Sequence, residues 1–290
     1  MRDYVPTRQR GRPARVRQSG LARLAVLALA VLAFAGAALS ASISQAGAPQ
    51  PRLGYGYDPN REVDVELVLA VDVSQSMDVD EQEIQRAGYV SALTSPQVLD
   101  AIRYGPTGRI AVTYFEWGGK GEQVVVADWA VIHDEATAAA FATRIAEAPL
   151  NHRQRTSIAS ALDRATTMVA TNDYEGLRKV IDISGDGPNN QGGTVTAFRD
   201  RAIAAGITIN GLPLMMKSDK DSWQTLMNID HYYEDCVIGG PGHFFVPVHS
   251  KAQFADAIRM KLVLEIAGLL HEPRILPASG RKPVNCSLFD

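Results

Sequence analysis

The chain has 290 residues, of which 46% are hydrophobic and 21% charged, so it can form one large core and is not disordered by composition. Its formal net charge of -3 conceals an asymmetry, because residues 1–46 contain seven arginines against one aspartate and the rest of the chain therefore carries -9. Phosphate binding needs a basic surface, so a domain this acidic argues against nucleic acid as a partner.

Residues 1–46 have the layout of an export signal. A basic start is followed by an uncharged apolar stretch over residues 24–41 and then by small residues that end in Ser44 and Ala46. The apolar run is also just long enough to be an uncleaved membrane anchor, so both interpretations stay open. Either one predicts export to the periplasm or cell envelope, with membrane contact only through this segment if it is not cleaved.

Residues 47–60 are rich in glycine and proline and have no apolar period, which predicts a linker in front of a domain over residues 61–270. Short apolar runs then alternate with amphipathic stretches. Strands are predicted at 63–72, 109–117, 123–132, from 179, 207–215 and 243–248, and helices at 79–102 with a break near Ser95 and Pro96, 134–147, 157–170, 195–205 and 251–270. The sequence GGKGE predicts a hairpin between the second and third strands. This alternation predicts an α/β fold with a mostly parallel sheet and helices on both faces.

The chain has two cysteines, Cys236 and Cys286, and their spacing fits no zinc pattern. An exported protein meets an oxidising compartment, where such a pair can persist as a disulfide. We predict that this bond attaches the C-terminal tail, residues 271–290. Two free or buried thiols remain the alternative, since sequence gives no distance between them.

Oxygen-bearing side chains occur in three loops that follow strands or precede helices. The first loop contains Asp72, Ser74 and Ser76, the second Thr156 and the third Asp186. In open α/β sheets, ligands bind beyond the carboxyl ends of the strands, near the point where the strand order reverses. Hydroxyl and carboxylate oxygens without His or Cys suit Mg²⁺, Mn²⁺ or Ca²⁺. The same residues could instead only form turns and cap helices, which would leave a metal-free scaffold.

As a set, these residues resemble the metal-ion-dependent adhesion site (MIDAS) of von Willebrand factor A-type domains, and the resemblance covers about residues 62–268. It implies a Rossmann-like, doubly wound sheet with helices on both faces. The segments ISGDGPNN and CVIGGPG are similar to a bacterial exported subgroup of this family whose function is unassigned.

The resemblance also implies roles for single residues. Ser74 and Ser76 would bind the cation, Mg²⁺ in the first place, through their hydroxyls. Thr156, Asp72 and Asp186 would act directly or through water, and a carboxylate from a partner would complete the octahedron. The family Asp usually follows Ser or Thr at the strand end, whereas Gly185 precedes Asp186 here. Asp182, inside the predicted strand, is therefore the alternative fifth residue.

Five further residues are candidates for a partner-binding rim: Glu116, Trp117, Arg153, Arg155 and Asn189. The two arginines, with His152, could attract a carboxylate, although a solvated loop is equally consistent with the sequence. Trp117 could instead pack under the hairpin. The sequence has no Gly-x-Ser-x-Gly elbow, Walker loop or HExxH motif. We therefore expect cation-dependent binding of a protein or peptide without catalysis, with metal-assisted hydrolysis as the opposing hypothesis.

Overall fold

The computed structural model describes residues 61–216, 228–268 and 281–287. The predicted export segment and linker, and most of the predicted tail, lie outside these residues. Within them, no helix combines the length and the apolar character needed to span a bilayer.

A five-stranded sheet forms the centre of the domain, in the order β3-β2-β1-β4-β5. Its strands are β1 (Glu62–Asp72), β2 (Ile110–Trp117), β3 (Gln123–Ile132), β4 (Glu175–Gly185) and β5 (Ile207–Pro213). All neighbours are parallel except β2 and β3, which form the predicted antiparallel hairpin. The chain adds strands on one side of β1 and then on the other, so the strand order reverses between β1 and β4. Loops after these two strands therefore lie where ligands bind in such sheets.

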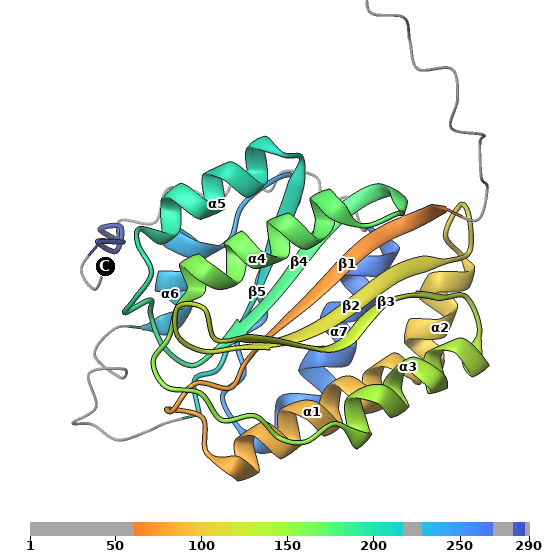
Figure 1. Cartoon of the computed structure of the whole chain (residues 1–290), viewed down its shortest axis with the longest axis horizontal. Coiled ribbons are helices and arrows are strands. Elements are labelled where there is room, and N and C mark those ends of the chain that lie inside the picture. The colour runs from red at the N-terminus through yellow and green to blue at the C-terminus, as the bar shows by residue number, and fades with distance from the viewer. Residues whose placement is uncertain (1–60, 217–227, 269–280, 288–290) are drawn as a thin grey trace, which may run out of the picture. The chain divides into compact units, whose positions relative to one another are not determined.

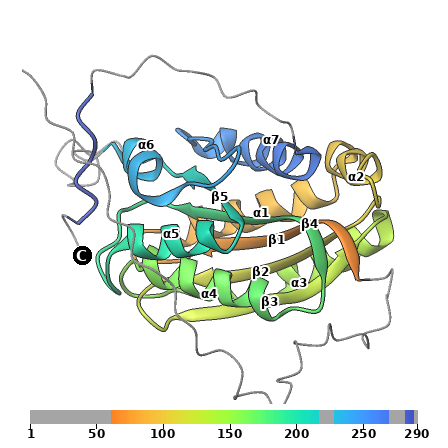
Figure 2. The same ribbon diagram turned by 90° about the horizontal axis from the view of Figure 1, so that it is seen from above.

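Helices cover both faces of the sheet. They are α1 (Val79–Leu93), α2 (Pro96–Arg103), α3 (Glu135–Glu147), α4 (Ile158–Thr171), α5 (Val195–Ala204), α6 (Ile229–Tyr232) and α7 (Phe254–Ala267), with a π-helical turn η2 (Tyr233–Val237) and a 3₁₀ turn η3 (Lys251–Gln253). Helices α4 and α5 lie in front of the sheet in Figure 1, with α7 behind it. Figure 2 shows α7 and α2 side by side along one side of the strands. The prediction of a doubly wound α/β fold is confirmed.

A hydrophobic core lies on each face of the sheet, and the central strand β1 contributes side chains to both. Leu67 and Leu69 pack into the core under α1 and α7, whereas Val68 and Ala70 pack into the core under α4. A strand buried on both faces reads as a continuous apolar run. Residues Leu67 to Val71 of β1 form such a run, and it ends at Asp72.

The predicted break between the first two helices is confirmed. Asp78 is the N-cap of α1 and forms a capping box with Glu81. The Asp78 side chain accepts a hydrogen bond from the backbone N–H of Glu81, and the Glu81 side chain accepts one from the backbone N–H of Asp78. Ser95 caps α2, and Pro96 occupies the first helical turn, where a missing N–H costs nothing.

Two predicted elements differ from the structure. The segment 243–248 forms no continuous strand but only single bridges, from Phe245 to Gly211 in β5 and from Val248 to Leu214 directly after β5. Val246 and Val248 donate to the carbonyls of Gly211 and Pro213, but Pro213 has no backbone N–H to donate in return, which interrupts the ladder between these bridges. The last α-helix is also shorter than 251–270, because its first turn is 3₁₀ and it ends at Ala267 before Gly268, which has φ 60°.

Candidate functional site

The first loop folds back on the end of β1. Asp72 is fully buried, and its Oδ1 accepts a hydrogen bond of 2.7 Å from the backbone N–H of Ser74. The Oγ atoms of Ser74 and Ser76 lie 3.0 Å apart. The second carboxylate oxygen, Asp72 Oδ2, is buried and has no hydrogen-bond partner among the described residues. The loop thus brings the hydroxyls of Ser74 and Ser76 together beside Asp72, whose Oδ2 atom accepts no hydrogen bond from the described residues.

The third loop joins the first. Asp186 follows β4 directly and is 5% exposed, and its Oδ1 accepts a hydrogen bond of 2.5 Å from Ser76 Oγ. Burial, and then the negative charge of Asp186, raise the pKa of Asp72 to about 8. Two buried carboxyl groups this close favour a positive charge between them.

The second loop is tied to both of the others. The backbone N–H of Arg153 donates to the carbonyl of Val73 at 2.9 Å. The N–H of Thr156 donates to Asn190 Oδ1 at 3.0 Å, and the Asn190 N–H donates back to the Thr156 carbonyl at 2.9 Å. Thr156 itself is 5% exposed and directly precedes Ser157, the N-cap of α4. The three loops expected to carry the ligands therefore meet at the carboxyl end of the sheet.

Asp182 belongs to a different cluster. It lies inside β4 on the α7 side, where its Oδ1 is 2.6 Å from Lys261 Nζ, and Lys261 is also paired with Glu265. All three side chains are at most 1% exposed. Burial, and then the nearby Asp182, raise the pKa of Glu265 to about 7. Asp182 is thus committed to α7, and Asp186 is the carboxylate that the structure places beside Ser76.

Two of the expected rim residues are interior residues. Glu116 is 2% exposed, pairs with Arg86 of α1 and accepts a hydrogen bond of 2.7 Å from Asn151 Nδ2. Trp117 is fully buried in the core under α4, against residues such as Ile158. The rim prediction is corrected at both positions, because β2 has a strand on each side and helices on both faces, which leaves its last residues covered.

The other three rim candidates, Asn189, Arg153 and Arg155, differ in their exposure to solvent. Asn189 is fully buried, where its Oδ1 accepts from the Ala159 N–H at 3.1 Å and its Nδ2 donates to the Gly193 carbonyl at 3.1 Å. It therefore fastens the third loop to α4 instead of facing a partner. Arg155 is exposed and has φ 62°, which is unusual for a residue other than glycine. Arg153 is half-buried, so Arg155 is the arginine beside Thr156 that a partner can reach.

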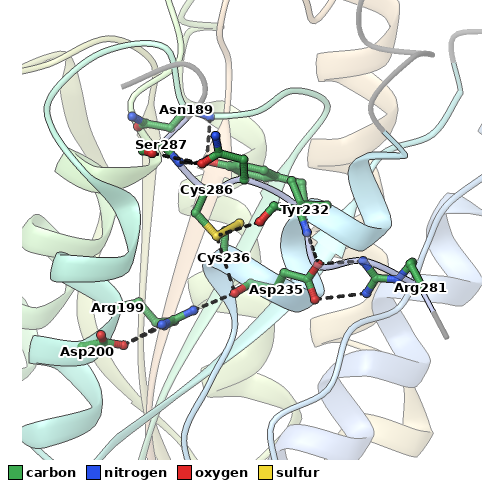
Figure 3. The surroundings of a disulfide bond; sticks show 11 residues. Asn189, Arg199, Asp200, Tyr232, Asp235, Cys236, Arg281, Cys286 and Ser287 are labelled. Atoms are coloured by element: carbon green, nitrogen blue, oxygen red, sulfur yellow. Dashed lines mark hydrogen bonds and ion pairs between the residues drawn. A yellow bond between two sulfur atoms is a disulfide. The ribbon is translucent and has the colours of Figure 1, made fainter. Parts of the chain in front are cut away.

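Cys236 and Cys286 form a disulfide with a Cα–Cα distance of 5.5 Å, as predicted. Figure 3 shows the ion pair beside it, in which Arg281 Nη1 lies 2.6 Å from Asp235 Oδ2. The N–H of Val284 donates to the same oxygen at 2.7 Å. The described part of the tail, residues 281–287, is therefore attached to η2.

The sequence analysis did not assign Tyr232 or Tyr233 to the site. The hydroxyl of Tyr232 accepts a hydrogen bond of 3.3 Å from the backbone N–H of Asn189, as Figure 3 shows. Tyr233 is fully buried beside the end of β4. The segment 229–237 has no regular apolar period and is distant in sequence from every ligand candidate, so no local signal pointed to it.

The donor set suits a hard cation better than zinc. Among the described residues, no cluster of three or more His, Cys, Asp or Glu side chains could hold a metal. The candidate site instead combines two carboxylates, Asp72 and Asp186, with hydroxyl groups. Oxygen ligands of this kind fit Mg²⁺, Mn²⁺ or Ca²⁺, and Asp72 Oδ2 offers an oxygen with no other partner.

A family model described as "Protein of unknown function (DUF1194)" matches residues 62–270. No curated protein matches the sequence. The pilus adhesin SpaC from Lactobacillus rhamnosus GG is 13% identical with a TM-score of 0.52, over 72% of this chain and 31% of SpaC. A von Willebrand factor type A structure from Catenulispora acidiphila is 16% identical with a TM-score of 0.48, over 71% of this chain and 43% of that one.

A third structure is proximal thread matrix protein 1 from the mussel byssus with a zinc-occupied MIDAS motif. It is 14% identical with a TM-score of 0.48, over 70% of this chain and 46% of that one. The present chain thus spans less than a third of SpaC and less than half of the other two. The similarity to SpaC is one of fold.

Proposed function

This chain belongs to the DUF1194 family of proteins of unknown function, and we propose that it is an exported domain that binds a protein or peptide partner through a divalent cation. Mg²⁺ is the expected ion, with Mn²⁺ or Ca²⁺ able to replace it. The ligand set would comprise Asp72, Ser74, Ser76, Thr156 and Asp186.

The observation that carries this proposal is the unpartnered oxygen of Asp72. A buried carboxylate oxygen without a donor is costly, and most such atoms in proteins have a partner. Asp186 adds a second buried carboxyl group, linked to the same loop through Ser76. A divalent cation at this point would give Asp72 Oδ2 its partner and offset the charges of both groups.

The character of the ligands supports binding of an anionic group. Ser74, Ser76 and Thr156 would supply only neutral hydroxyl ligands, so the cation would still favour a carboxylate from outside as its remaining ligand. Arg155 adds a positive charge at the exposed edge of the second loop. We assign the cation to binding and not to catalysis, because the sequence offers no motif for a nucleophile or base near these loops.

Three features support an adhesive or scaffolding role outside the cytoplasm. The N-terminal 46 residues have the layout of an export signal, and the disulfide suits an oxidising compartment. SpaC, which has the same fold, is a pilus adhesin. The proposal places this chain in the periplasm or cell envelope.

Affinity capture from an envelope extract tests the function. The purified protein is used as bait in Mg²⁺, in chelator, and in chelator followed by excess Mg²⁺, with Asp72→Ala as the defective bait and the exposed Asp100→Ala of α2 as the matched control. We expect one set of captured proteins that is lost in chelator, restored by Mg²⁺, absent with Asp72→Ala and retained with Asp100→Ala. Equal capture with and without chelator would contradict cation-dependent binding.

A further inference from the structure

Two buried polar atoms without partners flank Gly185 at the end of β4. The hydroxyl of Tyr233 lies 2.7 Å from the position that a Cβ on Gly185 would occupy, and Asp72 Oδ2 lies 2.9 Å from the same position. Both side chains are fully buried, and neither atom has a hydrogen-bond partner among the described residues. One is a donor and the other is an acceptor, so they are complementary.

The carboxylates of the candidate site are the charges that act most strongly on this phenol. Burial raises the pKa of Tyr233 well above its usual value, and the charges of Asp72 and then Asp186 raise it further. A phenol carries its proton at neutral pH, so the Tyr233 hydroxyl can serve as a hydrogen-bond donor to the candidate site.

Gly185 keeps the space between the two atoms open. Any side chain at this position would come within 3.4 Å of Trp117 as well as colliding with the hydroxyl and the carboxylate. The absence of a Cβ leaves room for the phenol to approach Asp72 directly or through one water. This accounts in physical terms for glycine where the resemblance led us to expect Ser or Thr.

We propose that Tyr233 is a positioning residue of the cation site, whose hydroxyl donates a hydrogen bond to Asp72 Oδ2, directly or through one water, and so orients this carboxylate toward the ion. The inference rests on the proposed function. Carboxylates that bind metals are commonly held by such outer hydrogen bonds, and losing one typically lowers metal affinity 10- to 100-fold.

The surrounding contacts fix Tyr233 in place. Tyr232, the preceding residue, accepts a hydrogen bond from Asn189 in the third loop. Cys236, in the same π-helical turn, is bonded to Cys286 (Figure 3). The turn that carries the phenol is thus held to the third loop on one side and to the tail on the other.

The test measures Mn²⁺ affinity of the full-length protein by calorimetry, with free Mn²⁺ followed independently by electron paramagnetic resonance. Tyr233→Phe removes only the hydroxyl and keeps the ring in the core. Tyr114→Phe is the matched control, because Tyr114 is also fully buried, its hydroxyl lacks a partner among the described residues, and it lies on the other face of the sheet. We expect a rise in Kd of 10-fold or more for Tyr233→Phe, no change for Tyr114→Phe, and equal melting temperatures in chelator.

The outcomes separate the two proposals. Parent and Tyr233→Phe binding Mn²⁺ equally would overturn the role of Tyr233 and leave the proposed function intact, whereas no Mn²⁺ binding by the parent would overturn both. If Tyr233→Phe does not fold, Gly185→Ala replaces it, since a Cβ there intrudes between the phenol and Asp72. The same 10-fold loss is then expected, and unchanged affinity would overturn the inference.

Discussion

Ser76 donates a hydrogen bond of 2.5 Å from its Oγ to Asp186 Oδ1, which joins two loops that are 110 residues apart in the chain. This contact identifies the carboxylate that completes the candidate site. Asp182, four residues earlier, points to the other face of the sheet and is held by Lys261. Asp186 therefore belongs to the candidate cation site and Asp182 to the buried ion pair with Lys261. Substituting Asp186 should change cation affinity, and substituting Asp182 should change the free energy of unfolding.

Asp186→Asn should weaken Mn²⁺ binding by 10-fold or more with little loss of stability, because the group lies in a loop and remains isosteric. Asp182→Asn should leave Mn²⁺ affinity unchanged and lower the free energy of unfolding by about 2 kcal/mol, since Lys261 loses a charged hydrogen-bond partner in the interior. Calorimetry and urea unfolding of both variants measure the two effects. The reverse assignment, with Asp182→Asn losing the cation, would refute the site as described.

The sequence was informative wherever the signal is local. The run that ends at Asp72, the hairpin, the break at Pro96 and the three oxygen-bearing loops all follow from periodicity, turn chemistry or motif spacing. Burial at the end of β2 was not predictable for Glu116 and Trp117, because it depends on which helices cover the strand. The proximity of Tyr233 to Asp72 was equally inaccessible, since it joins segments 161 positions apart through a turn with no apolar period.

Thr156 offers a test of the second loop. Thr156→Ala removes the hydroxyl but keeps the backbone hydrogen bonds to Asn190, so partner capture should fall much more than the melting temperature. Thr156→Ser retains the hydroxyl and should behave like the parent. Pull-down in Mg²⁺ and thermal melts in chelator make the comparison. A Thr156→Ala variant with full capture would remove this residue from the ligand set.

The disulfide should contribute substantially to stability. On the chain-entropy model, a bond between cysteines 50 residues apart stabilises the fold by about 4 kcal/mol. Cys236→Ser with Cys286→Ser should lower the free energy of unfolding by that order, and should also weaken Mn²⁺ binding because the turn that holds Tyr233 loses its attachment. Urea unfolding gives the first quantity and calorimetry the second. Thiol counting on exported, denatured protein provides the control, and two free thiols there would refute the bond.

The buried cluster beneath α7 should make stability depend on pH. The pKa of Glu265 is raised to about 7 in the folded protein from its ordinary value near 4.5. The contribution of the protonated Glu265 side chain to the free energy of unfolding is therefore complete below about pH 4.5 and is lost as pH rises through 7. Glu265→Gln removes this titration. Between pH 5 and pH 8 the stability of the variant should therefore gain on the order of 2 kcal/mol relative to the parent, as measured by urea unfolding. A difference that stays constant with pH would show that Glu265 does not titrate in this range.

The central claim is that Asp72 and its neighbours hold a divalent cation. Calorimetric titration of Mn²⁺ into the chelator-treated full-length protein, and into Asp72→Ala, tests this claim most directly. We expect one binding site per chain in the parent and none in Asp72→Ala, with both proteins folded by circular dichroism. A parent that binds no Mn²⁺, or an Asp72→Ala variant that binds it with the affinity of the parent, would contradict the account.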